Sequence, residues 1–146
     1  KDIILKPSKD FQHTHMIFDL AWSPSGKEIA AVDDCLSVWG VASGTNKFCR
    51  KDHKGFVYAV DWSPDGKKIV SSSNDGTTRI WDVSIGQMTL MLHGHRNNVL
   101  SVAWSLDGNH IATGGVDRTI RVWDSRSGQQ LHAHNINLDY VRYKLL

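Results

Sequence analysis

Residues 95–124 read HRNNVLSVAWSLDGNHIATGGVDRTIRVWD, and residues 53–82 read HKGFVYAVDWSPDGKKIVSSSNDGTTRIWD. The second stretch aligns with the first without a gap at a spacing of 42 residues, from 53 to 95. The six tryptophans of the chain form two series with almost the same spacing: Trp22, Trp62, Trp104 and Trp39, Trp81, Trp123. A fixed period of about 20 to 50 residues is typical of repeat architectures. The chain is therefore interpreted as a set of repeats.

Other landmarks recur in register with the tryptophans. Each member of the first series is followed four residues later by a glycine, and each member of the second is preceded six residues earlier by an aspartate: Gly26, Gly66, Gly108 and Asp33, Asp75, Asp117. A histidine stands nine residues before each tryptophan of the first series: His13, His53 and His95. These landmarks divide the chain into three repeats, 13–52, 53–94 and 95–133, with residues 1–12 and 134–146 at the two ends.

Each repeat has the composition of short β-strands separated by tight turns. Residues 57–62 and 119–123 are rich in β-branched and aromatic side chains. Pro64-Asp65-Gly66 and Asn74-Asp75-Gly76 are turn sequences, and helix-length amphipathic stretches are absent from the sequence. Four antiparallel strands in 40 to 42 residues form one blade of a β-propeller, so the sequence predicts an all-β fold.

The chain resembles the WD40-repeat family. The resemblance lies in Gly94-His95, which opens the third repeat, and in Ile80-Trp81-Asp82 and Val122-Trp123-Asp124, which close the second and third. It implies a partial WD40 β-propeller: three four-stranded blades, the outer strand of a preceding blade in residues 1–12 and the first strand of an incomplete fourth repeat in residues 134–146. Such an arc has uncovered ends, and we expect a longer parent chain or self-association to close the propeller.

The resemblance also implies a buried hydrogen-bonded tetrad in each blade. Its members would be His53, Ser71, Asp75 and Trp81 in the second repeat, and His95, Thr113, Asp117 and Trp123 in the third. The first repeat has Ala31 at the hydroxyl position, so its tetrad is expected to be incomplete and its blade the weakest. A serine hydrolase would need its nucleophile in a Gly-x-Ser-x-Gly context, which the sequence lacks, so we expect no catalytic residues.

Members of this family act as interaction scaffolds, which implies a protein or peptide partner in a multiprotein complex. By the same resemblance, the partner-binding residues would lie on the narrow face formed by the loops before the first strand and after the second: Phe56, Tyr58, Asn74, Asn98, Leu100 and Val116. Phe56 and Tyr58 are the expected anchors, because aromatic side chains give a large contact area at low entropic cost. The alternative is that both side chains pack within the blade.

Two further functions remain open at this stage. Trp123-Asp124-Ser125-Arg126 resembles the box by which some WD40 substrate receptors dock on the adaptor of cullin-based ubiquitin ligases, with Arg126 as its defining residue. The second alternative is a nucleic-acid-associated subunit, suggested by a local basic run at Lys47, Arg50, Lys51 and Lys54. The formal net charge of only +2 argues against that alternative.

The composition and the cysteines limit the class of protein and its cellular location. Hydrophobic residues make up 40% of the 146 residues and charged residues 22%, as in ordinary globular domains, and no apolar run is long enough to span a bilayer. Cys35 and Cys49 have no disulfide-scaffold or metal spacing, so an intracellular location, cytoplasmic or nuclear, is expected.

Three His-x-His pairs occur: His13/His15, His93/His95 and His132/His134. No carboxylate or thiol completes a site around them in the sequence, so no metal and no cofactor are expected.

Overall fold

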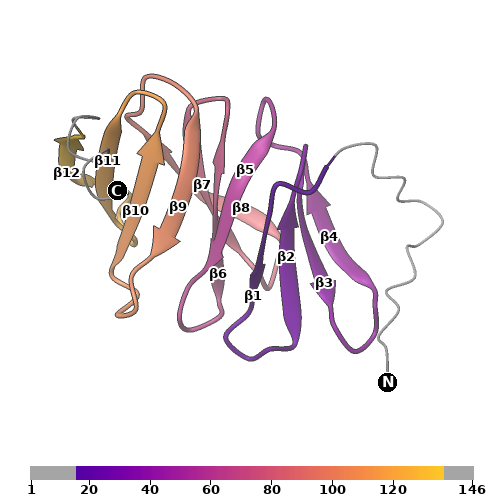
Figure 1. Ribbon diagram of the computed structural model, residues 1–146. Coiled ribbons are helices and arrows are strands. Elements are labelled where there is room, and N and C mark those ends of the chain that lie inside the picture. Colours follow the sequence, from indigo (N-terminus) through magenta and orange to yellow (C-terminus); the bar gives the residue numbers. More distant parts are fainter. Residues whose placement is uncertain (1–15, 137–146) are drawn as a thin grey trace, which may run out of the picture.

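The computed structural model describes residues 16–136, which form twelve β-strands in three four-stranded sheets (Figure 1). The first sheet contains β1 (Asp19–Trp22), β2 (Glu28–Val32), β3 (Leu36–Gly40) and β4 (Asn46–Arg50). The second contains β5 (Val57–Trp62), β6 (Lys68–Ser73), β7 (Thr77–Asp82) and β8 (Gln87–His93). The third contains β9 (Val99–Trp104), β10 (His110–Gly115), β11 (Thr119–Asp124) and β12 (Gln130–Asn135).

Each sheet is a simple antiparallel meander in which strands adjacent in sequence are paired. The three sheets, which we name blades 1, 2 and 3, follow one another as an open arc, with β5 packed against β1 on one side and β9 on the other (Figure 1). The predicted all-β fold with three propeller blades is confirmed. No helix that could cross a membrane occurs among residues 16–136. The strand expected in residues 1–12 lies outside the described residues.

The turn sequences explain where the strands reverse. After β5, the Ser63 hydroxyl accepts a hydrogen bond from the Lys68 amide at 2.9 Å, and Gly66 adopts a φ of +71°. An L-residue rarely adopts this conformation, so the glycine stabilises the reversal into β6. The same arrangement recurs in blade 3, where Ser105 accepts from the His110 amide and Gly108 has a φ of +77°.

Apolar packing and a few hydrogen bonds join neighbouring blades. Leu36 and Val38 of blade 1 pack with Trp62 and Trp81 of blade 2 in one buried cluster. The Trp62 indole N–H donates to the carbonyl oxygen of Ala21 at 3.0 Å. Between blades 2 and 3, Val70, Ile80 and Leu92 pack with Trp104 and Trp123, and the Asp61 carboxylate accepts from the Trp104 amide at 2.7 Å. These two seams hold the core of the molecule.

The two outer flanks of the arc are uncovered. Trp62 and Trp104 are 4% and 9% exposed, because a preceding blade covers each of them, whereas Trp22 at the corresponding position of blade 1 is 56% exposed. At the other end, Ile120 of blade 3 is 40% exposed, whereas its counterpart Leu36 of blade 1 is fully buried. The described residues therefore leave one apolar face open at each end.

The end of blade 3 differs from the predicted boundary at residue 133. β12 extends to Asn135, and His134 lies within this strand opposite Ile120. His134 therefore belongs to the outer strand of blade 3. The sequence interpretation had instead placed it at the start of a fourth repeat. His132 and His134 occupy the strand positions of Leu90 and Leu92 in blade 2, so His134 does not stand at the position of the tetrad histidines. Residues 137–146 lie outside the described part of the chain.

Candidate functional site

Polar side chains of blade 2 form a buried chain of hydrogen bonds. His53 Nδ1 lies 3.0 Å from Asp75 Oδ2, and His53 Nε2 lies 2.9 Å from Ser71 Oγ. The Trp81 indole N–H donates to Ser71 Oγ at 2.8 Å. One assignment satisfies every group: His53 donates to Asp75, and the Ser71 hydroxyl donates to His53. Ser71 is fully buried, which places its oxygen out of reach of a substrate.

Blade 3 repeats this arrangement with threonine in place of serine. His95 Nδ1 lies 3.0 Å from the Asp117 carboxylate, and His95 Nε2 lies 2.7 Å from Thr113 Oγ1. The Trp123 indole N–H donates to the same threonine oxygen at 2.9 Å. Asp117 also accepts from the backbone amides of Arg96 and Thr119. The structure thus brings together all eight residues assigned to the two tetrads, as a support for the fold.

The electrostatics of blade 2 follow from this burial. Burial raises the pKa of Asp75, but the hydrogen bonds from Thr77, the Lys54 amide and His53 outweigh it, so the pKa lies far below the ordinary value of 3.8. Asp117 behaves in the same way. Burial lowers the pKa of His53 below its ordinary value of 6.5, and the hydrogen bond to Asp75 only partly opposes this. His53 is therefore neutral in the folded protein at neutral pH.

We expect stability to fall as the pH drops below about 6.5, because the unfolded chain takes up a proton at His53 that the folded chain does not. One such proton gives a slope of up to about 1.4 kcal/mol per pH unit. A second decline below about pH 4 follows from Asp75 and Asp117, whose carboxylates must be protonated on unfolding. The free energy of urea unfolding, measured at a series of pH values from about 7.5 down to about 3, tests both declines. A His53→Gln variant that kept the first decline would contradict this assignment.

Blade 1 satisfies its tryptophan by a different route. Ala31 stands where blades 2 and 3 have a hydroxyl, as the sequence indicated. The Trp39 indole N–H instead donates to Ser37 Oγ at 3.0 Å, and Ser37 donates to the carbonyl oxygen of Ala31 at 3.2 Å. Ser37 is opposite Ala31 on the neighbouring strand β3, at the position of Arg79 in blade 2. In blade 1 the hydroxyl thus comes from β3 and not from β2, and the Trp39 indole still has a hydrogen-bond acceptor.

The residues expected to bind a partner lie at one narrow face of the arc. The carbonyl oxygen of Phe56 accepts from the Asn74 amide at 3.0 Å, and that of Asn98 accepts from the Val116 amide at 2.9 Å. The loop before the first strand and the turn after the second therefore meet in both blades. Leu100 lies in β9 close by and is 49% exposed.

An aromatic cluster forms on this face between blades 1 and 2. Phe18 lies edge-on to Phe56, with ring centroids 5.6 Å apart, and edge-on to Tyr58 at 5.3 Å. Tyr58 is half-buried, whereas Phe18 and Phe56 are exposed. The sequence interpretation missed Phe18. Its position, four residues before Trp22, is that of Tyr58 before Trp62, so the repeat itself carried the signal.

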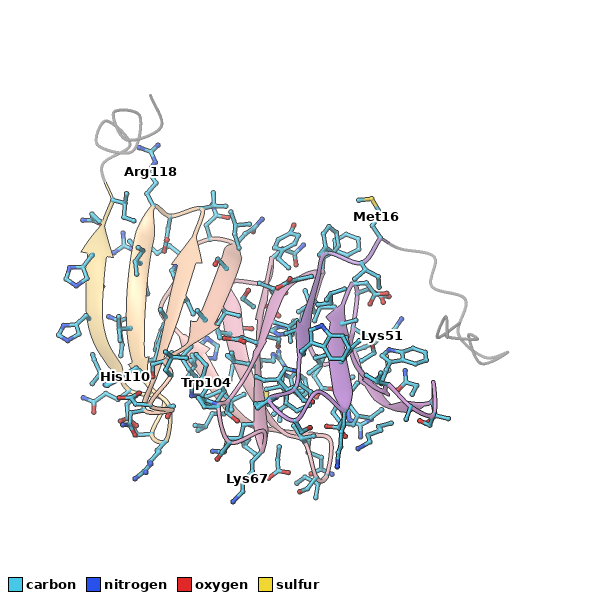
Figure 2. All side chains as sticks on the ribbon, turned by 60° about the horizontal axis from the view of Figure 1, so that its bottom comes forward. Met16, Lys51, Lys67, Trp104, His110 and Arg118 are labelled. Carbon is cyan, nitrogen blue, oxygen red and sulfur yellow. The ribbon has the colours of Figure 1, made fainter. Side chains whose placement is uncertain are left out.

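The opposite narrow end carries different residues. Figure 2 shows Met16 and Arg118 at one end of the strands and Lys67 and His110 at the other. Leu106, in the turn preceding His110, is 96% exposed. Arg126 is exposed in the turn after β11, where its amide donates to Asp124. Arg126 thus lies away from the aromatic cluster.

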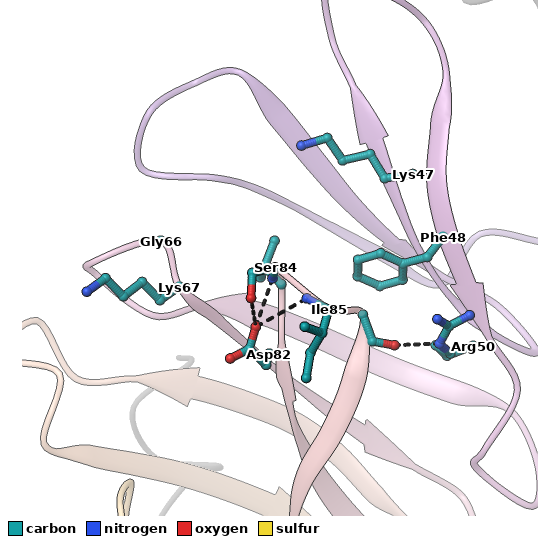
Figure 3. Close-up of a pocket in the computed structure, with 10 residues that line it drawn as sticks. Lys47, Phe48, Arg50, Gly66, Lys67, Asp82, Ser84 and Ile85 are labelled. Atoms are coloured by element: carbon teal, nitrogen blue, oxygen red, sulfur yellow. Dashed lines mark hydrogen bonds between the residues drawn. The ribbon is translucent and has the colours of Figure 1, made fainter.

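Two of the cavities beside blade 2 are similar in volume. One, of about 630 Å³, lies between β4 and the turn that joins β7 to β8 (Figure 3). There the Arg50 side chain donates to the Gly86 carbonyl oxygen, and a Cβ on Gly86 would lie 2.9 Å from the Phe48 ring, so only glycine fits this contact. The other cavity, of about 610 Å³, lies where the β4–β5 connection, the β6–β7 turn with β7, β8 and the β8–β9 connection meet.

Among the described residues, one group of side chains brings three possible metal-ligand atoms together. Asp33, Asp34 and Cys35 place their ligand atoms within 4.8 Å of one another, and Lys51 forms a 2.7 Å ion pair with Asp34. The imidazole rings of His132 and His134 stack with centroids 5.9 Å apart on exposed β12. In the pair His93/His95, both ring nitrogens of His95 are engaged in the tetrad. Cys35 and Cys49 are free thiols.

The comparisons with known proteins agree with this architecture. The family model described as "WD domain, G-beta repeat" matches residues 5–40, 44–82 and 86–124, so the chain belongs to the WD40 family of β-propeller repeat proteins. Proteins built from these repeats generally act as protein-interaction scaffolds. No curated protein sequence matches the chain significantly.

A solved structure described as "Structure of U3-55K" has a similar fold. It superimposes with a TM-score of 0.83 at 21% sequence identity, over 88% of this chain and 42% of that chain. At this identity the likeness shows the fold alone. The present chain spans less than half the length of that neighbour, so the partners of a whole propeller protein are a matter for proposal.

Proposed function

We propose that the chain is a non-catalytic scaffold module that binds a protein or peptide partner at the narrow face bearing the aromatic cluster. The exposed apolar side chains on that face carry the proposal. They come from all three blades: Met16 and Phe18, Phe56, Leu100 and Val116, which are 74%, 39%, 36%, 49% and 46% exposed. Aromatic and aliphatic groups gathered on one face, with polar neighbours such as Asn74 and Asn98, are typical of a protein-binding surface.

The strands that carry these loops support the proposed partner-binding role of this face. Loops tolerate variation while the strands fix their positions, so a face built from loop residues can acquire specificity without loss of the fold. Phe56 is fixed by two hydrogen bonds to its carbonyl oxygen, from the Asn74 amide and the Ser73 hydroxyl. Its backbone is therefore held in place, and the edge-on contact with Phe18 packs its ring. We infer an intracellular location, cytoplasmic or nuclear, because both cysteines are free thiols.

Replacing Phe56 with alanine is expected to weaken partner binding by about 2 kcal/mol, roughly 30-fold, because exposed aromatic anchors dominate such interfaces. A photo-crosslinking amino acid at position 56 would first capture the partner and identify it by mass spectrometry. Titration calorimetry then compares the affinity of Phe56→Ala with that of Leu106→Ala, which removes a still more exposed apolar side chain at the opposite end. Equal losses in the two variants, or no crosslink at position 56, would reject this face.

A further inference from the structure

The cavity of about 610 Å³ beside blade 2 is lined by basic side chains and amides. Lys54 and Arg96, each one residue after a tetrad histidine, lie on its rim, with His93 from β8. Arg79 lies in its wall. The remaining polar lining residues include the amide side chains Asn74, Asn97 and Asn98. The volume lies within the range of sites that take a ligand group of several heavy atoms.

Arg79 is incompletely paired for a buried arginine. It is 6% exposed, and its Nε–H has no hydrogen-bond acceptor among residues 16–136. Its Nη1 contacts only the sulfur of Met88 at 3.5 Å, and its Nη2 lies 3.8 Å from Asp75 Oδ2. Because a guanidinium offers five N–H donors, this arrangement leaves donor capacity unused.

The corresponding arginine of blade 3 provides the contrast. Arg121 Nε donates to Thr119 Oγ1 at 3.2 Å, and Arg121 Nη1 donates to Gln130 Oε1 at 2.6 Å. Gln130 occupies the position that Met88 holds in blade 2. Blade 2 therefore has a sulfur where blade 3 has an amide oxygen, and the arginine of blade 2 lines the cavity.

The charges in the cavity do not cancel one another. Asp75 is the acidic residue of its lining, and its oxygens already accept from His53, the Lys54 amide and Thr77. The side chains of Lys54 and Arg96 form no ion pair with residues 16–136. A carboxylate or phosphate would meet three cationic groups within one confined volume, and charge-assisted hydrogen bonds of this type are the strong ones.

We propose that this cavity binds the carboxylate or phosphate group of an acidic peptide segment, held by Lys54, Arg79 and Arg96. This deepens the proposed function and rests on it, because Asn74 joins the cavity to Phe56 on the aromatic face through its amide hydrogen bond. A peptide seated on the aromatic cluster can thus place an acidic residue in the cavity. A nucleic acid is disfavoured, because the cations form one cluster and the formal net charge is only +2.

Fluorescent peptides of equal length test the proposal, one rich in glutamate, one containing phosphoserine and one with glutamine instead. The two acidic peptides are expected to bind and the glutamine peptide is not. The double variant Lys54→Gln/Arg96→Gln should lose at least tenfold in affinity, whereas Lys67→Gln/Arg126→Gln, with the same change in charge, should lose none. Tighter binding of phosphoserine assigns the site to phosphate, and equal binding assigns it to carboxylates; both support the proposal.

Several results would overturn it. Equal losses in the two double variants would mean diffuse charge attraction, and a single-stranded oligonucleotide that binds more tightly than both acidic peptides would exclude a peptide site. A second readout is the side-chain Nε–H resonance in nitrogen-correlated NMR, which should shift for Arg79 and stay fixed for Arg121 on titration with the phosphoserine peptide; equal shifts would contradict the proposal. If neither acidic peptide binds while Phe56→Ala still weakens partner binding, the cavity proposal fails and the proposed function stands.

Discussion

Replacing Asp117 with alanine is expected to destabilise the protein by about 3 to 5 kcal/mol, the loss typical of removing one partner from a buried charged network. Asp117 accepts from His95, from the amides of Arg96 and Thr119, and from the Thr119 hydroxyl. Alanine leaves these donors without a partner in the protein interior. Chemical denaturation monitored by tryptophan fluorescence measures the change.

Asp33→Ala in blade 1 is the matched comparison and should cost less, about 1 to 3 kcal/mol. The Trp39 indole donates to Ser37 Oγ, whereas in blade 3 the Trp123 indole donates to Thr113, which contacts the same His95 that is paired with Asp117. Ser37 also replaces the arginine that lies near the aspartate in the other two blades. Equal destabilisation by the Asp33 and Asp117 variants would show that blade 1 relies on its aspartate as strongly as blade 3.

The second large effect concerns the open flanks. The 146-residue chain on its own is expected to self-associate or aggregate, because Leu20 and Trp22 on blade 1 are each 56% exposed and Ile120 and Leu131 on blade 3 are 40% and 39% exposed. Flat apolar sheet faces of this kind bind one another in water. Size-exclusion chromatography with light scattering should give a mass above 16.4 kDa that rises with concentration.

Charged substitutions on one flank should reverse this behaviour. Leu20→Lys/Trp22→Lys is expected to shift the chain towards the monomer, because lysines resist burial against an apolar face. Ile85→Lys/Leu106→Lys adds the same charge at two exposed turn positions and should leave association unchanged. A monodisperse 16.4 kDa species with a cooperative melt would show that an open three-blade arc is stable alone.

Much of the fold was predictable because tryptophan marks the same two positions in every repeat. Trp62 and Trp81 both lie in the seam with blade 1, so their spacing reports a structural requirement. The tetrads were accessible for the same reason, since His53, Ser71 and Asp75 keep their spacing to Trp81. These features depend on positions along one chain segment, which a sequence displays directly.

Other features depend on contacts across strands. The Ser37 substitute lies on β3, so no spacing within β2 indicated it. The incomplete pairing of Arg79 depends on Met88 of the neighbouring strand, and the cavity beside it is formed by segments far apart in the sequence, from Lys54 to Asn98. The aromatic contact of Phe18 joins two blades, and the interpretation had considered the partner face only within blades 2 and 3.

The matched repeats are out of phase with the blades by one strand, which has a genetic consequence. The unit 44–82 begins with β4, the outer strand of blade 1, and ends with β7 of blade 2. Deletion of one such unit would leave β1, β2 and β3 followed by β8, itself an outer strand. Duplication would likewise insert an outer strand and three inner ones in the correct order. Gain or loss of whole units in evolution therefore leaves four-stranded blades intact, and the length of the array can change without an intermediate that carries a broken sheet.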